Sequence, residues 1–323
     1  MRVHVLHHAA CFDGAASAAV FTAFYRDCVR SDATFVYIPK AHQQGDPFVD
    51  DDFAADDSAI VDFRYSTHPK LGWFFDHHVS AFQLPGQRAH FDADHSGRRF
   101  HDPKAPSCTR FIADVGRDVF GWDSSAHTEL LRWANLIDTA SFPDPSMPVE
   151  LEEPALQLMT FVEQNRDRIS AERFIADLLD TPLTDLSGAD YVRAVVDPAL
   201  ELHRRDIELM RGRLRVVRGV ATYDLSDQPP RAYNKFIAYS LHPEIRYLVG
   251  VSRGPDGSHK LSVGYNPWLP ADEREHDIAA LCEQLGGGGH PYVGGASFPA
   301  EDADAARAAL ADTAAALRDP SQP

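Results

Sequence analysis

The chain has 323 residues, of which 44% are apolar and 24% are charged, a globular composition that excludes a disordered or fibrous protein. It contains 31 Lys and Arg against 48 Asp and Glu, so its formal net charge is −17, which disfavours a protein that coats duplex nucleic acid or binds membranes. The four cysteines form no CxxC pair, and neither a signal peptide nor a membrane-spanning run is evident, so we expect a reduced, cytoplasmic protein.

The first half of the chain alternates short apolar segments with stretches of helical character. Strands are predicted at residues 3–6, 34–38, 59–63 and 73–75, and helices at residues 15–25, 107–115 and 129–138. This alternation favours a mostly parallel sheet flanked by helices. Ligands of such sheets gather at the carboxyl ends of the strands, so polar residues at those ends are the candidates for a site.

The second half is predicted to contain a helical region, a connecting helix and a smaller α/β domain. Asp197 and Pro198 favour the start of the connecting helix, because Asp is a good N-cap and Pro is common at the first helical position. The other predicted elements are helices within 151–186, 278–285 and 305–318, and strands at 215–225, 246–252 and 260–265. We therefore predict a domain of residues 1–196, a connecting helix of residues 197–213 and a C-terminal domain of residues 214–323.

Four polar clusters stand out in the first half, which holds ten of the 16 histidines within 101 residues. They are HHAACFDG at 7–14, Asp62 in AIVDF, FFDHH with Asp76, His77 and His78, and Asp138 at the end of a helix. Each cluster alone is more typical of a turn or an exposed loop. Together they indicate a divalent metal site, because carboxylates and imidazoles suit Mn²⁺ or Mg²⁺, and clustered carboxylates repel one another unless a cation neutralises them.

The second half carries a glycine-rich motif, GGGGHPYVGGASF, at residues 286–298. One glycine would suffice to end the preceding helix, whereas several glycines let backbone N–H groups approach an anion closely. Four glycines followed by His290 therefore favour contact with a substrate over a simple helix end. The order of all these motifs resembles the DHH phosphoesterase superfamily with its DHH-associated C-terminal domain, which carries a GGGH motif. The resemblance implies two α/β domains with the active site in the cleft between them.

The resemblance implies a two-metal site. Asp62 would bridge both ions, and Asp13, His77 and Asp138 would complete the shell of one of them. The expected metal is Mn²⁺, with Mg²⁺ or another divalent ion as an alternative. Two ions hold a bridging water and the phosphoryl oxygens, so the reaction needs no covalent nucleophile.

The second ion is where this chain departs from the family pattern. The family places an Asp at the position of Cys11, and a thiolate suits a softer metal, so the second ion would be weaker, softer or absent. A small packed Cys11 with no ligand role is the alternative. The histidine ligand would be His8 or, at the spacing of pyrophosphatase-like members, His7, and we favour His8. Asp76 would orient a histidine, and His78 would contact the substrate phosphate.

On the substrate side, the resemblance assigns contacts to the glycine motif of the C-terminal domain. The family often carries an arginine in a strand of this domain, but Gly264 stands at the comparable position here. Arg253, at the end of the preceding predicted strand, is the candidate replacement. The residues expected to bind substrate are Gly287, Gly288, Gly289, His290 and Arg253.

These observations lead to one functional hypothesis and two alternatives. We expect a divalent-metal-dependent phosphoesterase that hydrolyses phosphodiester or terminal phosphate bonds of short single-stranded oligonucleotides or small nucleotides by metal-activated water. A nucleotide phosphatase or cyclic-dinucleotide phosphodiesterase of the same family is one alternative. A nucleotide-binding sensor that has lost catalysis is the other, and Cys11 motivates it. No duplex nucleic acid and no membrane is expected as a partner, and the sequence makes no prediction of the oligomeric state.

Overall fold

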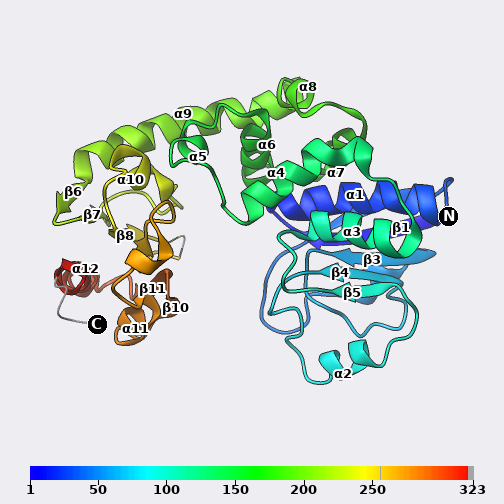
Figure 1. Cartoon of the computed structure of the whole chain (residues 1–323), viewed down its shortest axis with the longest axis horizontal. Coiled ribbons are helices and arrows are strands. Elements are labelled where there is room, and N and C mark those ends of the chain that lie inside the picture. The colour runs from blue at the N-terminus through cyan, green and yellow to red at the C-terminus, as the bar shows by residue number, and fades with distance from the viewer. Residues whose placement is uncertain (255, 319–323) are drawn as a thin grey trace. The chain divides into compact units, whose positions relative to one another are not determined.

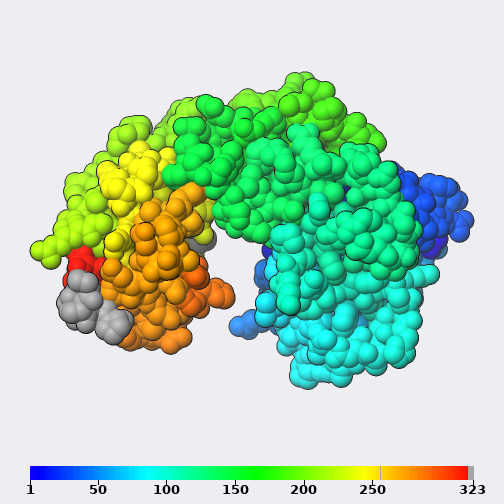
Figure 2. All heavy atoms as spheres, in the orientation of Figure 1, coloured from blue at the N-terminus to red at the C-terminus, as the bar shows by residue number. Residues whose placement is uncertain are grey.

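The computed structural model describes residues 1–254 and 256–318, and the chain divides into two compact units. The N-terminal unit contains residues 1–142 and 152–199, and the C-terminal unit contains residues 143–151 and those that follow 199. Each unit is a continuously packed body in the space-filling view (Figure 2). The chain therefore has the two α/β units that the sequence predicts.

The N-terminal unit is built on a five-stranded, wholly parallel sheet with the strand order β2-β1-β3-β4-β5 (Figure 1). Its strands are β1 (Arg2–His8), β2 (Thr34–Lys40), β3 (Asp57–Val61), β4 (Trp73–Asp76) and β5 (Arg99–His101). The central strands form because they are apolar runs buried on both faces, as parallel sheets require. The sequence did not predict β5, because three residues with two polar side chains carry almost no strand pattern.

Helices surround this sheet, and α1 and α3 lie against one of its faces (Figure 1). Helix α1 also packs against α4, α6 and α7, and its many alanines let these neighbours approach closely. None of the helices in the described ranges is long and apolar enough to cross a bilayer. The helices that begin in this unit are α1 (Phe12–Cys28), α2 (Gln87–Asp92), α3 (Cys108–Phe120), α4 (Thr128–Asp138), α6 (Pro154–Gln164), α7 (Arg168–Asp180), α8 (Leu183–Ser187) and α9 (Asp190–Arg213).

Helix α9 begins earlier than the sequence indicated. We predicted a start at Asp197 and Pro198, but the helix starts at Asp190 and Pro198 lies inside it. A proline inside a helix costs about 3 kcal/mol, because it removes one backbone hydrogen bond and crowds the preceding turn. Val192 and Val196 are completely buried, and burial of a valine contributes roughly 1.5–3 kcal/mol each, which offsets that cost.

The C-terminal unit contains a six-stranded mixed sheet with the order β10-β11-β9-β8-β7-β6, in which only β7 and β8 are parallel. Its strands are β6 (Arg215–Val217), β7 (Val220–Leu225), β8 (Tyr247–Arg253), β9 (His259–Tyr265), β10 (Gly288–His290) and β11 (Val293–Phe298). Its helices are α5 (Met147–Glu150), α10 (Phe236–Leu241), α11 (Ile278–Glu283) and α12 (Ala303–Arg318). The single strand predicted at residues 215–225 was wrong. Arg218 and Gly219 both have a positive φ, so a tight two-residue turn divides this segment into the hairpin β6–β7.

Part of the glycine motif forms a strand, which the sequence did not predict. Gly288–His290 forms β10, which pairs with β11, and the two backbones run very close together. A Cβ atom at Gly287 would lie 2.0 Å from the Gly295 carbonyl oxygen, and one at Gly289 would lie 2.3 Å from that of Val293. Strand packing therefore requires glycine at these two positions, and a role in substrate contact stays a prediction.

Candidate metal centre

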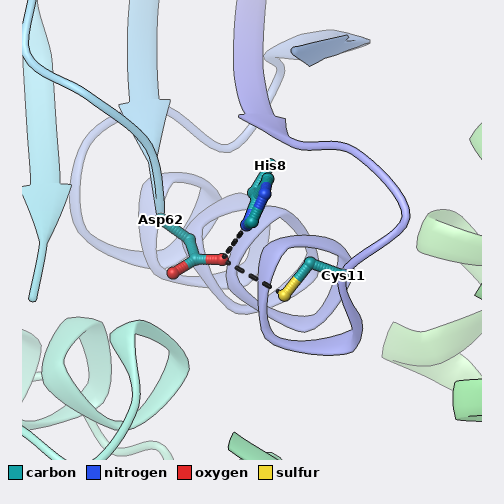
Figure 3. A group of neighbouring side chains, drawn as sticks. All are labelled: His8, Cys11 and Asp62. Carbon is teal, nitrogen blue, oxygen red and sulfur yellow. Dashed lines mark hydrogen bonds and ion pairs between the residues drawn. The ribbon is translucent and has the colours of Figure 1, made fainter. Parts of the chain in front are cut away.

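The carboxyl ends of β1, β3 and β4 bring the predicted site residues to one edge of the N-terminal sheet. Figure 3 shows His8 at the end of β1, Asp62 just after β3, and Cys11 at the start of α1. Asp62 has a φ of 55°, in the left-handed region that Asp tolerates better than most residues. This turn directs the carboxylate of Asp62 toward the start of α1, and Asp62 is only 1% exposed.

The first group of donors consists of His8, Cys11 and Asp62. The Nδ1 atom of His8 lies 3.7 Å from Oδ2 of Asp62, and the Cys11 thiol donates to the same oxygen at 3.6 Å (Figure 3). Burial, followed by the nearby carboxylates of Asp62 and Asp13, raises the pKa of the Cys11 thiol well above its usual value. The protein without a cation therefore holds Cys11 as a thiol, and a bound cation would favour the thiolate.

The second group surrounds the Nε2 atom of His77. This atom lies 3.4 Å from Oδ2 of Asp138, 3.5 Å from Oδ1 of Asp62 and 3.8 Å from Oδ2 of Asp13. The Nδ1–H of His77 is positioned to donate to the carbonyl oxygen of Ala105 at 3.0 Å, which leaves Nε2 for a cation.

The pKa values of His77 and Asp62 show that a positive charge stabilises the clustered carboxylates. Burial lowers the pKa of His77, but Asp62, the Ala105 carbonyl group and the other two carboxylates raise it to about 10. Burial raises the pKa of Asp62, but the neighbouring rings of His77 and His8 hold it at about 2. A proton on His77 thus supplies the charge that a metal ion would otherwise supply.

Helix α3 holds Asp13 in place through its first turn. The backbone N–H groups of Cys108 and Thr109 donate to the two carboxylate oxygens at 2.7 and 3.1 Å. Ser107 caps the helix by accepting from the N–H of Arg110, so the first turn is firmly formed. Burial, with Asp62 and Asp138 nearby, raises the pKa of Asp13, and a cation would relieve this repulsion.

Asp76 is fully buried and fixes the orientation of His78. One of its carboxylate oxygens accepts from Nδ1 of His78 at 2.7 Å and from the backbone N–H groups of His77 and His78 at 2.9 and 3.3 Å. The hydrogen bond to Asp76 raises the pKa of His78. Because Nδ1 is engaged, the other ring nitrogen of His78 is the one available to a ligand.

The structure brings most of the predicted residues together, but not all. Every donor group contains atoms within 4.8 Å of one another, and the groups together comprise His8, Cys11, Asp13, Asp62, His77, His78 and Asp138. His7 belongs to none of them. Its ring is buried, which lowers its pKa to about 4, and Nδ1 contacts the carbonyl oxygen of His8. The glycine motif and Arg253 belong to the C-terminal unit.

Sequence reasoning missed His42. Its ring lies 4.7 Å from that of His8 and 5.1 Å from that of Phe63, measured between ring centroids. The only sequence signal was the density of histidines in the first 101 residues, since no motif includes this one.

The donor set fits divalent cations. His8 Nδ1, Asp62 Oδ1 and His77 Nε2 are buried and have no hydrogen-bond partner, which is costly unless a ligand satisfies them. Carboxylates and imidazoles are ligands for Mn²⁺ and related ions, and the thiol of Cys11 adds a softer donor to one group.

Comparison with known proteins bears on the fold. No family model and no curated protein sequence matches the chain. Among solved structures, a pGpG-specific phosphodiesterase, PggH from Vibrio cholerae, matches with a TM-score of 0.67 and 18% identity over 98% of this chain and 99% of that one. The chain therefore shares the fold of this structure.

Two further structures share this fold. A DHH domain described as a member of the s1p family of ribosomal proteins matches with a TM-score of 0.57 and 14% identity, over 97% of this chain and 86% of that one. The exonuclease RecJ bound to manganese matches with a TM-score of 0.51 and 13% identity, over 99% and 91% of the two chains. At these identities the likeness establishes the fold alone.

Proposed function

We propose that this chain is a divalent-metal-dependent phosphoesterase that hydrolyses phosphodiester or terminal phosphate bonds of short oligonucleotides or small nucleotides. The observation that carries the proposal is the position of Asp62. One of its oxygens faces His8 and Cys11, and the other faces His77 and His78. A carboxylate shared between two donor groups is what a pair of neighbouring cations requires.

The residues would divide as follows. His8, Cys11 and Asp62 would hold one cation, and Asp13, His77, Asp138 and Asp62 would hold another, or one cation alone if the Cys11 group stays vacant. Bound divalent ions lower the pKa of a coordinated water and neutralise charge on the phosphoryl oxygens. Mn²⁺ is our first choice because the similar RecJ structure was determined with manganese.

The chain's own groups position the phosphate. The Nδ1 atom of His78 is engaged by Asp76, whose carboxylate raises the pKa of the ring and favours its charged form, so Nε2 can donate to a phosphoryl oxygen. Asp76 keeps this ring in one orientation. Asp76 is therefore a positioning residue, and His78 is the group that contacts the substrate.

The main test is a time course with end-labelled di- to pentaribonucleotides in Mn²⁺, with Asp138→Asn run in parallel. We expect stepwise release of mononucleotides by the wild type and strong loss of turnover in the variant, because Asp138 is one of three carboxylates around His77. Equal turnover by both proteins would contradict the metal assignment. Nucleotide binding without turnover by the wild type would favour a nucleotide-binding sensor.

The glycine motif offers a separate test. We propose that His290, which is exposed at the end of β10, contacts the nucleotide together with the backbone of Gly288, where a Cβ atom would meet no neighbour. His290→Ala should raise KM about tenfold and leave the bound metal unchanged, since one hydrogen bond is worth roughly 1.4 kcal/mol. Metal analysis of the purified variant supplies the control, and loss of metal would contradict this division of roles.

A further inference from the structure

Arg64 is a buried cation without a counter-charge. Arg64 is 6% exposed, and every other Lys and Arg in the described part of the chain is more exposed than a buried residue. Its guanidinium donates to the carbonyl oxygens of Gln43 and Gly45 at 2.9 and 3.5 Å and to the side-chain oxygen of Gln83 at 2.5 Å. All three acceptors are neutral, and Nε is buried without any partner.

Other partly buried cations of the N-terminal unit are neutralised. Lys40 pairs with Asp52, and Arg99 pairs with Asp94. Within the described ranges no Asp or Glu forms an ion pair with Arg64, although the chain has 17 more acidic than basic side chains. A buried charge carries a large desolvation cost unless a partner offsets it, so the missing counter-charge needs an explanation.

Arg64 lines a cavity of about 500 Å³ that is open to solvent, and most of its other lining residues are exposed. The wall contains no acidic residue and is rich in amide side chains, which can donate to an anion. The residues that line it are His42, Gln43, Gln44, Gly45, Arg64, Gln83 and Leu84. The cavity thus combines room, hydrogen-bond donors and one unneutralised positive charge.

The cavity adjoins the metal centre. His42 lines it, and the ring of His42 contacts the ring of His8. Phe63 contacts both of these rings, and the guanidinium of Arg64 lies 5.4 Å from the centre of the Phe63 ring. A group bound in the cavity would therefore be separated from His8 by the ring of His42.

We propose that this cavity binds a phosphate group other than the one hydrolysed, and that the bound anion is the counter-charge of Arg64. A guanidinium with amide donors matches the tetrahedral oxygens of phosphate well. The phosphate can come from the terminal phosphate of a nucleotide substrate or from free inorganic phosphate, and the experiment distinguishes these sources.

The first arm does not depend on the proposed function. Metal-free protein in EDTA is titrated with inorganic phosphate, and binding is measured by calorimetry and by the shift in Tm, with chloride at matched ionic strength as the reference. We expect phosphate to bind and to raise Tm above the chloride value. No phosphate effect beyond that of chloride would overturn the proposal.

Two variants assign the binding to Arg64. Arg64→Met removes the charge and keeps the length of the side chain, so phosphate binding should weaken at least tenfold while Tm without phosphate holds or rises. Gln83→Glu places a carboxylate beside the guanidinium, where it competes with phosphate for the positive charge. Phosphate binding should again weaken at least tenfold, and the chain should stay folded. Gln164→Glu, the same change at an exposed position on α6, should bind phosphate as the wild type does.

The two variants also separate a binding role from a purely structural one. If Arg64 served only to hold the loop of Gln43 and Gly45, Arg64→Met would lower Tm and Gln83→Glu would still bind phosphate normally. That pattern would overturn the proposal. If Arg64→Met fails to fold, Gln83→Glu decides the question by itself.

The second arm identifies the source of the phosphate, and it rests on the proposed function. Turnover of a dinucleotide with a 5′-phosphate is compared with turnover of the same dinucleotide with a 5′-hydroxyl in Mn²⁺. A preference for the 5′-phosphate that disappears in Arg64→Met assigns the cavity to the substrate. Phosphate binding in the first arm without such a preference assigns it to free phosphate, and absence of all turnover contradicts the proposed function alone.

Discussion

At the residue scale, the centre is defined by charges that do not balance without a cation. Asp13, Asp62 and Asp138 converge on one histidine nitrogen, and these carboxylates, with the Ala105 carbonyl group, raise the pKa of His77 to about 10. Asp76 is different, because it donates no ligand atom to these groups and acts through His78.

The Asp76–His78 pair predicts a pH dependence. The hydrogen bond to Asp76 raises the pKa of His78, so the charged form of the His78 ring persists to higher pH than in a free histidine. The charge is lost as the pH rises through this raised pKa. Asp76→Asn removes the negative partner, so the pKa of His78 should fall and the alkaline limb of the pH–rate profile should move to lower pH. We also expect turnover at neutral pH to fall by about 10–100-fold. An unchanged alkaline limb in the variant would contradict the role of His78 as a proton-bearing contact.

At the scale of elements, the positions of the motif side chains are set by the ends of the strands and helices that carry them. The N-terminus of α3 holds Asp13 with two backbone N–H groups, and the ends of β1 and β3 place His8 and Asp62 side by side. In the C-terminal sheet, Gly250 of β8 lies directly under the ring of Tyr223 on β7, with which it is paired in register.

This contact predicts a stability difference between two glycine substitutions. A Cβ atom at Gly250 would lie 1.9 Å from Cζ of Tyr223, so Gly250→Ala should destabilise the C-terminal unit by about 1–3 kcal/mol through overpacking. Gly212, in the last turn of α9, would meet nothing within 4 Å, and Gly212→Ala should be neutral or stabilise by up to about 1 kcal/mol. Urea unfolding of both variants checks this, and equal effects would show that the Tyr223 contact is not as tight as the structure indicates.

At the scale of the whole molecule, the two units have separate hydrophobic cores and carry different candidate site residues. The candidate metal ligands all belong to the N-terminal unit, whereas the glycine motif and Arg253 belong to the C-terminal unit. Each unit also has a hydrophobic core of its own.

This division predicts how metal changes thermal unfolding. Mn²⁺ at 100 times its Kd should stabilise the N-terminal unit by about 2.7 kcal/mol, because only this unit contains the ligands. Calorimetry should therefore show that Mn²⁺ raises the unfolding temperature of the N-terminal unit and leaves that of the C-terminal unit unchanged. Asp62→Ala should abolish the shift, and Asp51→Ala, which changes an exposed acidic residue of the same unit, should retain it. A shift that survives in Asp62→Ala would contradict the assignment of the bridging ligand.

The sequence by itself determined the α/β class, four of the five strands of the N-terminal sheet and the motifs whose residues meet at its carboxyl edge. These follow from local patterns, namely buried apolar runs and polar residues directly after them. Strand β5, the hairpin at Arg218 and Gly219, and the start of α9 did not follow, because each depends on packing that outweighs a weak local pattern.

Only the tertiary structure decided which histidine joins the centre, and why the glycines are needed. His7 and His8 are adjacent in sequence, but only the ring of His8 meets Asp62 and Cys11 at the end of β1. Gly287 and Gly289 look like an anion loop in the sequence, yet the close approach of β10 and β11 requires them. His42 and Arg64 belong to no motif, and their places beside His8 and in the cavity wall come from neighbours distant in the chain, which one-dimensional patterns do not encode.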